Sequence, residues 1–248
     1  MKKGVILGIA LAILATSLAC TVTFPSVSVN IDRMEGSGNV IEETREVRDF
    51  SRVRLAGFGR LYIERGETES LRIEAEDNLL QYITTEVKGE ELDIRWQKNI
   101  LVTNHEPVNF YLTVKTLDTI TLDGAGDIEA PDMRAETFAV NANGAGNFEL
   151  LNLEADALVV TVSGAGNVTV TGEVMAQTVK INGLGYYQAL DLESETAQVE
   201  INAAGSATVR VSDDLNATIN GAGSIDYYGN PTVSQHVNGV GRISRIDE

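Results

Sequence analysis

The feature that most constrains the fold of this chain is a Gly-x-Gly motif that recurs through its second half. Counted at the first motif residue, the copies begin at Gly124, Gly144, Gly164, Gly183, Ala203, Gly221 and Gly239. The steps between them are 20, 20, 19, 20, 18 and 18 residues, and the copy at Ala203 is degenerate because it has Ala-Ala-Gly. A nearly fixed period of this length is typical of repeat proteins, in which each structural unit stacks on the next.

The residues around each motif alternate between apolar and polar types. Apolar side chains dominate two and four positions before the first motif residue and four positions after it, whereas the intervening residues are mostly polar. An alternation with period two indicates β-strands with one buried face. A unit of about 20 residues cannot bury that face alone, but stacked units can. The sequence therefore predicts an all-β fold, a parallel β-helix or solenoid with coils of about 20 residues and Gly-x-Gly corners.

The Gly-x-Gly motif has a structural and a ligand-binding interpretation. Glycine permits positive φ and close approach between coils, and Asn tolerates turns and can hydrogen-bond to an Asn of the next coil. As structural corner residues we assign Asn143, Gly144, Gly146, Gly164, Gly166, Asn182, Gly183, Gly185, Asn220, Gly221, Gly223, Asn238, Gly239 and Gly241. The alternative is calcium bound between turns, which needs about 6–8 oxygen ligands. Only Asp127 places a carboxylate directly after a motif, so the sequence favours a structural corner and no metal.

Residues 41–117 alternate in the same way but without the strict period. We expect strands near residues 51–56, 60–65, 70–76, 83–88 and 91–96. We also expect a helical turn in the segment EDNLLQYI and an early copy of the corner at Gly57, Phe58 and Gly59. This N-terminal β-rich part would continue the stack and close its first end, since the ends of a solenoid need protection. The seven-copy repeat solenoid then occupies residues 118–248.

The first 40 residues have the features of an exported protein. A basic start precedes an apolar run at residues 5–14, which is too short for a membrane span of about 20 residues. Cys20 is the only cysteine and follows the sequence SLA, which resembles a bacterial lipobox, although Ser17 stands where Leu is usual. We predict a signal peptide over 1–19, acylation of Cys20, and a tether over 20–40. Simple secretion and an uncleaved anchor are the alternatives.

Composition argues against several functions. The chain of 248 residues has a formal net charge of −17, which makes nucleic acid a poor partner because phosphates attract Lys and Arg. The two histidines, His105 and His236, lie far apart and show no metal-ligand spacing. No copy of the motif continues to Gly-x-Gly-x-x-Gly, so we expect no nucleotide site. We therefore predict no enzyme and no cofactor. A polysaccharide-active enzyme, which the fold class alone would allow, ranks below the other functions.

Aromatic side chains are few and are the best candidates for a ligand face. The chain has two adjacent pairs, Tyr186-Tyr187 and Tyr227-Tyr228, so one ring of each pair should point outward from a strand. Exposed rings can stack on sugars or on partner proteins. We identify Tyr186, Tyr228 and Trp96 as the candidate ligand face. The alternative is that Tyr187 and Tyr227 fill the core while the other rings cover neighbouring strands.

The segment that begins SGNVIEETREVRDFSRVRLAGFGRLYIERGETESLRIEAEDNLLQYI, followed by repeated Asn-Gly-Ala-Gly, resembles the putative auto-transporter adhesin, head GIN domain family. The stretch DYYGNPTV matches the usual ending of that family, and the resemblance covers about residues 38–245. It implies a right-handed β-helical fold and an exported bacterial protein, in many cases a lipoprotein. It brings no catalytic residues. The family's usual corner is Gly-Ser-Gly-Asp, and the Ala and Asn found here weaken the case for a metal.

Two functions therefore remain. The first is a non-enzymatic, adhesin-like binding module, anchored as a lipoprotein in the cell envelope outside the cytoplasm, with a glycan or an envelope or matrix protein as its partner. The second is a structural or envelope-maintenance lipoprotein without a dedicated ligand. A contiguous exposed aromatic or apolar face would favour the first, and an evenly charged surface the second.

Overall fold

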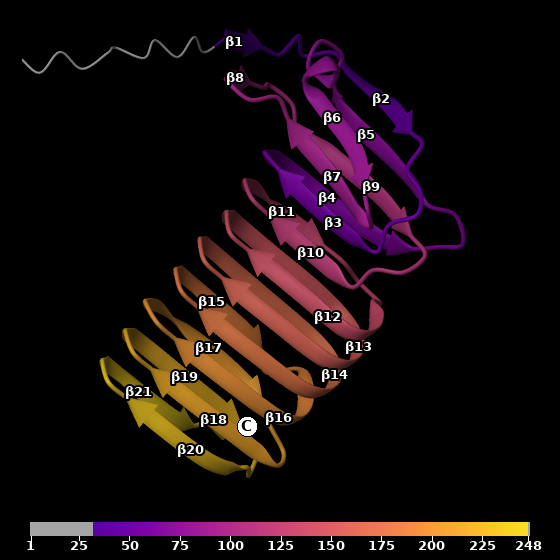
Figure 1. The fold of residues 1–248 in the computed structure, drawn as a ribbon. Helices are drawn as coiled ribbons and strands as arrows, with labels where there is room; N and C mark the ends of the chain where they lie inside the picture. The colour runs from indigo at the N-terminus through magenta and orange to yellow at the C-terminus, as the bar shows by residue number, and fades with distance from the viewer. Residues whose placement is uncertain (1–31, 248) are drawn as a thin grey trace, which may run out of the picture. The chain divides into compact units, whose positions relative to one another are not determined.

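Stacked coils run through most of the chain in a computed structural model, which describes residues 32–247 (Figure 1). Apart from one short 3-10 helix, η1 (Leu80–Tyr82), every element in these residues is a β-strand. The prediction of an all-β solenoid with coils of about 20 residues is therefore confirmed. Within residues 32–247, no helix is long and apolar enough to cross a membrane. The signal peptide, Cys20 and most of the predicted tether lie outside the described residues.

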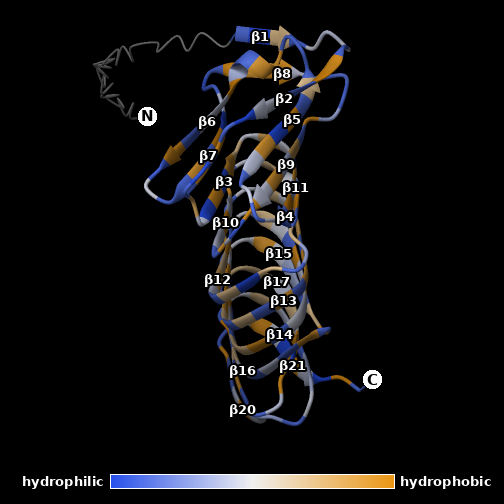
Figure 2. Cartoon of the chain, turned by 90° about the vertical axis from the view of Figure 1, so that its right-hand side faces the viewer, coloured by the Kyte–Doolittle hydropathy of each residue, from blue (hydrophilic) through white to orange (hydrophobic). Residues whose placement is uncertain are grey.

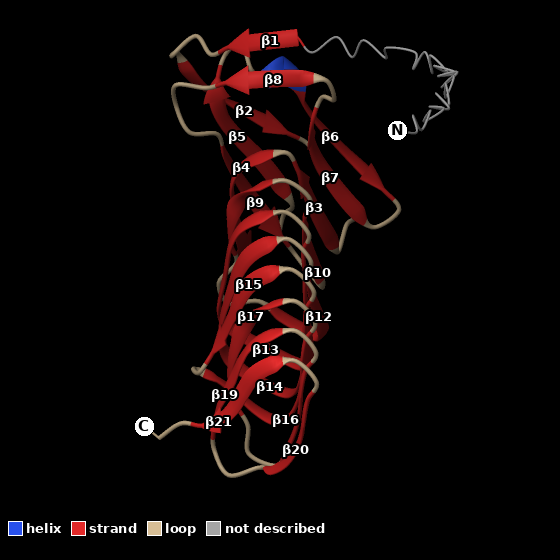
Figure 3. Cartoon of the chain, turned by 90° about the vertical axis from the view of Figure 1, so that its left-hand side faces the viewer, coloured by secondary structure: helices blue, strands red, loops and turns tan. Residues whose placement is uncertain are grey.

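Each coil contributes one segment before its Gly-x-Gly corner and one segment after it. The pre-corner face contains β3 (Arg52–Ala56), β10 (Thr119–Leu122), β12 (Arg134–Ala142), β16 (Leu192–Ile201), β18 (Asp214–Ile219) and β20 (Thr232–Val237). The post-corner face contains β4 (Phe58–Arg65), β11 (Ala125–Glu129), β15 (Leu184–Ala189), β17 (Ala204–Arg210), β19 (Ala222–Tyr228) and β21 (Val240–Arg245). The long strands β13 (Ala145–Val162) and β14 (Ala165–Ile181) contribute to both faces. Figure 3 shows the corner turns aligned along one edge of the stack.

Neighbouring coils pair in parallel, with equivalent repeat positions in register. Phe148 on β13, for example, lies between Ile128 on β11 and Val168 on β14. The apolar positions predicted around the motif are buried in the first six copies, and Figure 2 shows the alternation of hydrophobic and hydrophilic residues along the strands. In the last copy Gln235 and Val237 are exposed, because no further coil covers them within the described chain. The core is thus a narrow apolar column enclosed by the two faces.

Close approach between coils explains the first glycine of each corner. Gly57 of the early corner has a φ of 150°, whereas in the seven-copy repeat none of these first glycines has a positive φ. A Cβ added there would instead collide with the backbone of the preceding coil; at Gly164 it would meet the carbonyl oxygen of Gly144. Positive φ occurs at the second glycine of one copy, Gly146 (157°), and at the opposite turn of the coil, where Asp132 and Asn152 both have a φ of 57°. The spacing between coils therefore determines the residue at the corner.

The strands expected in residues 41–117 are confirmed, and the expected helical turn is η1. Phe58 pairs in register with Ala125, which makes Gly57–Gly59 an early corner. The strands β7 (Glu91–Trp96) and β9 (Asn109–Val114) extend the parallel stack beyond β3 and β4. Antiparallel pairing begins at these two strands. β5 (Ser70–Glu76) pairs antiparallel with β9 and with β2 (Val40–Arg45), and β6 (Ile83–Lys88) pairs antiparallel with β7. A separate parallel ribbon is formed by β1 (Asp32–Glu35) and β8 (Ile100–Thr103).

A short hydrogen-bonded network lies inside the otherwise apolar column. The hydroxyl of the fully buried Tyr187 donates to Oε1 of Gln177 at 2.9 Å. Nε2 of Gln177 donates to Oγ of Ser194 at 2.8 Å, and this hydroxyl donates to the carbonyl oxygen of Arg210 at 2.7 Å. Burial raises the pKa of the Tyr187 phenol far above its usual range. Because each buried polar group has a partner, the network fixes one arrangement of the coils around it.

We expect Gly164→Ala to lower the free energy of unfolding by about 1–3 kcal/mol, because its new methyl group meets the preceding coil. Gly166→Ala is the matched control in the same corner, since its methyl group would lie 3.1 Å from the carbonyl oxygen of Gly146 and needs only a small adjustment. Urea unfolding of both variants measures the difference. Equal stabilities would contradict the dominance of coil spacing at the first motif position.

Tyr187→Phe should lower the free energy of unfolding by about 1–3 kcal/mol, because it leaves the buried Oε1 of Gln177 without a donor. The control is Tyr186→Phe, which removes the hydroxyl of an exposed ring one residue earlier on the same strand and should leave stability unchanged. Urea unfolding followed by circular dichroism compares the two variants. If Tyr187→Phe were as stable as the parent, the network would not support the fold.

Candidate functional site

Trp96, one of the three predicted ligand-face residues, belongs to the interior. Its ring stacks on Phe58 with centroids 4.1 Å apart, and its Nε1 donates to the carbonyl oxygen of Phe58 at 2.9 Å. Only 6% of Trp96 is exposed, and a Cβ added at Gly57 would collide with it. The prediction that Trp96 binds a ligand is therefore wrong, because this ring covers the first corner of the stack.

The other two predicted residues, Tyr186 and Tyr228, are on the post-corner face but line different hollows. Tyr186 is 54% exposed near the start of β15, and its neighbour Tyr187 fills the core. Tyr228 ends β19 and is half-buried, with the guanidinium carbon of Arg210 4.6 Å from its ring centroid. Tyr227 is also half-buried. The fold therefore does not bring the predicted ligand-face residues together.

The polar residues that precede the corners form a ladder in two runs, which are separated at Ser163. Its amide hydrogen bonds run from Asn143 to Asp123 (2.8 Å), Asn202 to Asn182 (2.9 Å), Asn220 to Asn202 (2.8 Å) and Asn238 to Asn220 (3.0 Å). These bonds tie equivalent residues of neighbouring coils together, so they favour the in-register stack. In the part of the chain that the structure describes, no three His, Cys, Asp or Glu residues are grouped so that they could hold a metal ion.

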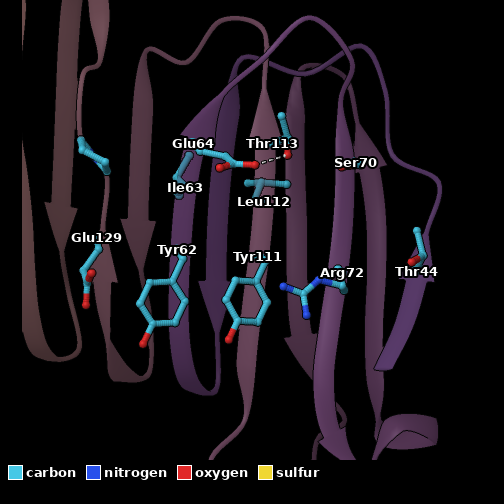
Figure 4. A pocket seen from close by; sticks show the side chains of 11 residues that line it. Thr44, Tyr62, Ile63, Glu64, Ser70, Arg72, Tyr111, Leu112, Thr113 and Glu129 are labelled. Carbon is cyan, nitrogen blue, oxygen red and sulfur yellow. Dashed lines mark hydrogen bonds between the residues drawn. The ribbon is translucent and has the colours of Figure 1, made fainter. Parts of the chain in front are cut away.

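A shallow cavity of about 510 Å³ lies on the outer side of the post-corner face, where the parallel stack meets the antiparallel strands. Its floor is a row of outward-pointing side chains, one from each of five neighbouring strands. Across β11, β4, β9, β5 and β2 they are Glu129, Tyr62, Tyr111, Arg72 and Thr44 (Figure 4). The rest of the lining consists of Ile63, Glu64, Ser70, Leu112, Thr113 and Pro131. We call this cavity the tyrosine groove.

Three planar groups stack along the floor of the tyrosine groove. The rings of Tyr62 and Tyr111 have centroids 5.2 Å apart and planes within 14° of each other. The guanidinium carbon of Arg72 lies 3.9 Å from the centroid of Tyr111. Both rings are half-buried. On each strand the residues directly before and after the tyrosine are buried in the core, so the ring points outward. The sheet therefore holds a preformed aromatic and cationic stack at the surface.

Carboxylates hold the cationic end of this stack. Nη1 of Arg72 donates to Oε1 of Glu42 at 2.6 Å and lies 3.9 Å from Oε2 of Glu74. The hydroxyl of Tyr111 donates to the same Glu74 oxygen at 3.3 Å. Burial, followed by the negative charge of Glu74, raises the pKa of Tyr111. Tyr111 is therefore a neutral hydrogen-bond donor. Glu42 and Glu74 hold the guanidinium of Arg72 against the ring of Tyr111.

The opposite end of the groove has carboxylates, and no cation of residues 32–247 lies over the ring of Tyr62. Oγ1 of Thr113 donates to Glu64 at 3.1 Å, beside Tyr62. Arg60, two residues before Tyr62 on β4, lies 3.7 Å from Asp127. Interaction with Tyr62 and then with Asp127 raises the pKa of Arg60. Among the described residues Glu129 forms no ion pair, so its carboxylate is free to interact with a bound molecule.

This combination of groups fits recognition of a polar ring. An aromatic ring can stack against an apolar face of a ligand, while carboxylates and hydroxyls at the border accept and donate directional hydrogen bonds. Such convergent polar groups around an apolar floor are typical of small-molecule sites. The lining has no His or Cys, the side chains that most often serve as base or nucleophile.

Sequence reasoning did not identify Tyr62 and Tyr111 as a site because they are far apart in the chain and only the strand register makes them neighbours. A weak signal was present in each strand. The triplets Leu61-Tyr62-Ile63 and Phe110-Tyr111-Leu112 each place a tyrosine between two apolar residues, which marks both rings as outward-facing. Their pairing could not be inferred, since β9 lies outside the strict repeat.

Comparison with protein families gives one match that spans most of the chain. The model of the family described as putative auto-transporter adhesin, head GIN domain, matches residues 49–231. That interval contains the strict repeat up to its sixth copy, and most of the tyrosine groove. The comparison with curated proteins gives no match.

Solved structures of bacterial proteins share the fold. A putative adhesin from Bacteroides fragilis is 25% identical, with a TM-score of 0.83 over 86% of this chain and 100% of the other. A putative lipid binding protein from Parabacteroides distasonis is 22% identical, with a TM-score of 0.71 over 87% of this chain and 100% of the other. A putative adhesin from Parabacteroides merdae is 21% identical, with a TM-score of 0.64 over the same shares. The two Parabacteroides structures show similarity of fold alone.

Glu74→Gln should lower the pKa of Tyr111 toward its ordinary value of about 10 but leave it raised, because burial, the larger cause, remains. A raised pKa means that folding favours the neutral phenol. The stability that Tyr111 contributes is therefore present below pH of about 10 and is lost as the pH rises further. Phenolate absorbance during an alkaline titration measures the change, and Tyr111→Phe identifies the transition of this residue. An unchanged transition in Glu74→Gln would contradict the role of that carboxylate.

Proposed function

Because this chain belongs to the putative auto-transporter adhesin, head GIN domain family, we propose that it is a non-enzymatic surface-binding module that recognises a glycan in the tyrosine groove. The observation that carries the proposal is the stack of Tyr62, Tyr111 and Arg72 on the floor of that groove. The rings point away from the core, so the fold does not use them for interior packing. A rigid aromatic surface can receive the apolar face of a sugar ring without reordering the protein.

The border of the groove supports a glycan over an apolar ligand. Glu64 and Glu129 offer carboxylate oxygens, and Ser70 and Thr113 offer hydroxyls, beside the stacked rings. Sugar hydroxyls both donate and accept hydrogen bonds, so this mixture of groups can pair with them. The cavity is shallow and open, so a chain of sugars could continue beyond the residues that contact the rings.

Export and anchoring form part of the same proposal. Removal of residues 1–19 and acylation of Cys20 would attach the module to a membrane of the cell envelope, facing outside the cytoplasm, with residues 20–40 as the tether. The short apolar run before Cys20 supports this placement, as does the adhesin name of the family. A surface module that meets glycans needs such a location.

A lipid is a second candidate ligand, because one structure with this fold is described as a putative lipid binding protein. The charged side chains across the groove, Glu129 at one end and Arg72 near the other, suit a polar headgroup better than an acyl chain. We therefore rank a lipid below a glycan. A structural or envelope-maintenance lipoprotein without a ligand remains the alternative function, and a polysaccharide-active enzyme ranks last.

Binding of the lipid-free chain from residue 21 onward to an array of glycans and envelope polysaccharides tests the proposal. This form is suitable because the described residues, 32–247, all lie within one compact unit. We expect saturable binding to at least one glycan, and a loss of affinity of about tenfold or more in Tyr62→Ala, since a central aromatic contact is worth at least ~1.4 kcal/mol.

Tyr186→Ala is the control, because Tyr186 is exposed on the same face but does not line the tyrosine groove. It should bind as the parent does. Loss of binding in Tyr186→Ala with full binding in Tyr62→Ala would move the site to the face first predicted from the sequence. Absence of binding by a folded, β-rich sample to every glycan would favour the structural role instead.

A further inference from the structure

One half of the tyrosine groove already contains a complete cation site, and its occupant is a side chain of the protein. The guanidinium of Arg72 lies 3.9 Å from the ring centroid of Tyr111 and hydrogen-bonds to Glu42 at 2.6 Å, with Glu74 at 3.9 Å. A positive group is thus held between an aromatic ring and two carboxylates. This is a favourable arrangement for a cation, because the ring and the carboxylates both attract it.

The other half of the groove also combines an aromatic ring with carboxylates, but in a different order. On the side of Tyr62 away from Tyr111, the row continues to Glu129 on β11 (Figure 4). The strand register then places Glu149 on β13 next to Glu129. Glu64 lies beside the same ring and accepts a hydrogen bond from Thr113. The outer side of Tyr62 is therefore bordered by carboxylates, as Tyr111 is. The position that corresponds to Arg72 is Glu129, and no Arg or Lys of the described residues lies over the ring of Tyr62.

The charges of the neighbouring residues strengthen this comparison. Glu129 and Glu149 are adjacent in the row, and neither forms an ion pair within the described residues, although like charges directly opposite each other on a sheet repel. Arg60 lies one row away, 3.7 Å from Asp127. Interaction with Tyr62, and then with Asp127, raises the pKa of Arg60, and Glu129 contributes least to that rise. A cation bound between Tyr62 and Glu129 would reduce the repulsion between the carboxylates of Glu129 and Glu149.

We infer that the ligand of this groove is an amino sugar with a free, positively charged amino group, which binds between Tyr62 and Glu129. The inference rests on the proposed function, since it names the class of glycan for the same site. The ring of the sugar stacks toward Tyr62, its ammonium group is attracted by Glu129 and Glu64, and its hydroxyls meet Ser70 and Thr113. An N-acetylated sugar has no positive charge at this position and loses that attraction.

Isothermal titration calorimetry of the lipid-free chain with a glucosamine tetrasaccharide and with its fully N-acetylated form tests the inference. We expect the amino form to bind at least about tenfold more tightly at low salt, and the difference to shrink as salt screens the charges. Glu129→Gln should remove most of the preference. Tyr62→Phe should keep it and Tyr62→Leu should lose it, because the preference depends on the ring face rather than on the hydroxyl.

Glu173→Gln is the matched control, because it neutralises an exposed carboxylate on β14 that does not line the groove. Its preference should equal that of the parent, and thermal unfolding should show that Glu129→Gln and Tyr62→Leu are folded. Equal affinity for both tetrasaccharides, abolished by Tyr62→Leu, would overturn the inference and leave the proposed function intact. Binding of neither would count against both. Oligolysine that binds as tightly, with the same dependence on Glu129, would show that the site takes a basic peptide instead and would overturn the assignment to a sugar.

Discussion

Each coil of this protein lies one strand spacing, about 4.8 Å, from the next, and pairs with it in parallel and in register. The composition of the repeat follows from that spacing. The first corner glycine leaves no room for a methyl group against the coil before it, and Asn side chains at the preceding position bond from coil to coil. Inside, Val, Ile, Leu and Phe stack on equivalent residues and exclude water. The narrow column also tolerates one polar network, at Tyr187, because all of its members are paired.

Strict stacking places equivalent repeat positions side by side, so a row that joins side chains of unrelated segments arises where the repeat ends. In this chain that happens at β9, which pairs in parallel with β4 on one side and antiparallel with β5 on the other. The reversal places side chains from unrelated segments in one row across the sheet. Tyr62 contributes from the stack, whereas Tyr111 and Arg72 contribute from the closing strands. The strands that close this end of the solenoid thus cover its first coils and also create the tyrosine groove.

Charge distribution in the groove is asymmetric, although the whole chain is acidic. Arg72 neutralises the end that β5 and β2 provide, through Glu42 and Glu74. The end toward β11 keeps the carboxylates of Glu129 and Glu149 without an ion-pair partner in the described chain. Family membership accounts for the fold, since the model of the family described as a putative adhesin covers residues 49–231. The charge asymmetry of the groove depends on particular side chains rather than on the fold. It favours a positively charged ligand.

The sequence by itself determined the solenoid, the positions of the strands and the corner ladder, because a period of about 20 residues and strict alternation leave few other ways to bury apolar side chains. It also marked Tyr62 and Tyr111 as outward-facing, since each lies between core residues. Only the tertiary structure decided that these two rings are neighbours and that Trp96 is buried. Pairing across β4, β9 and β5 depends on contacts between distant segments, and no local pattern encodes such contacts. The position of Trp96 depends on the open first corner, which exists only once the coils have stacked.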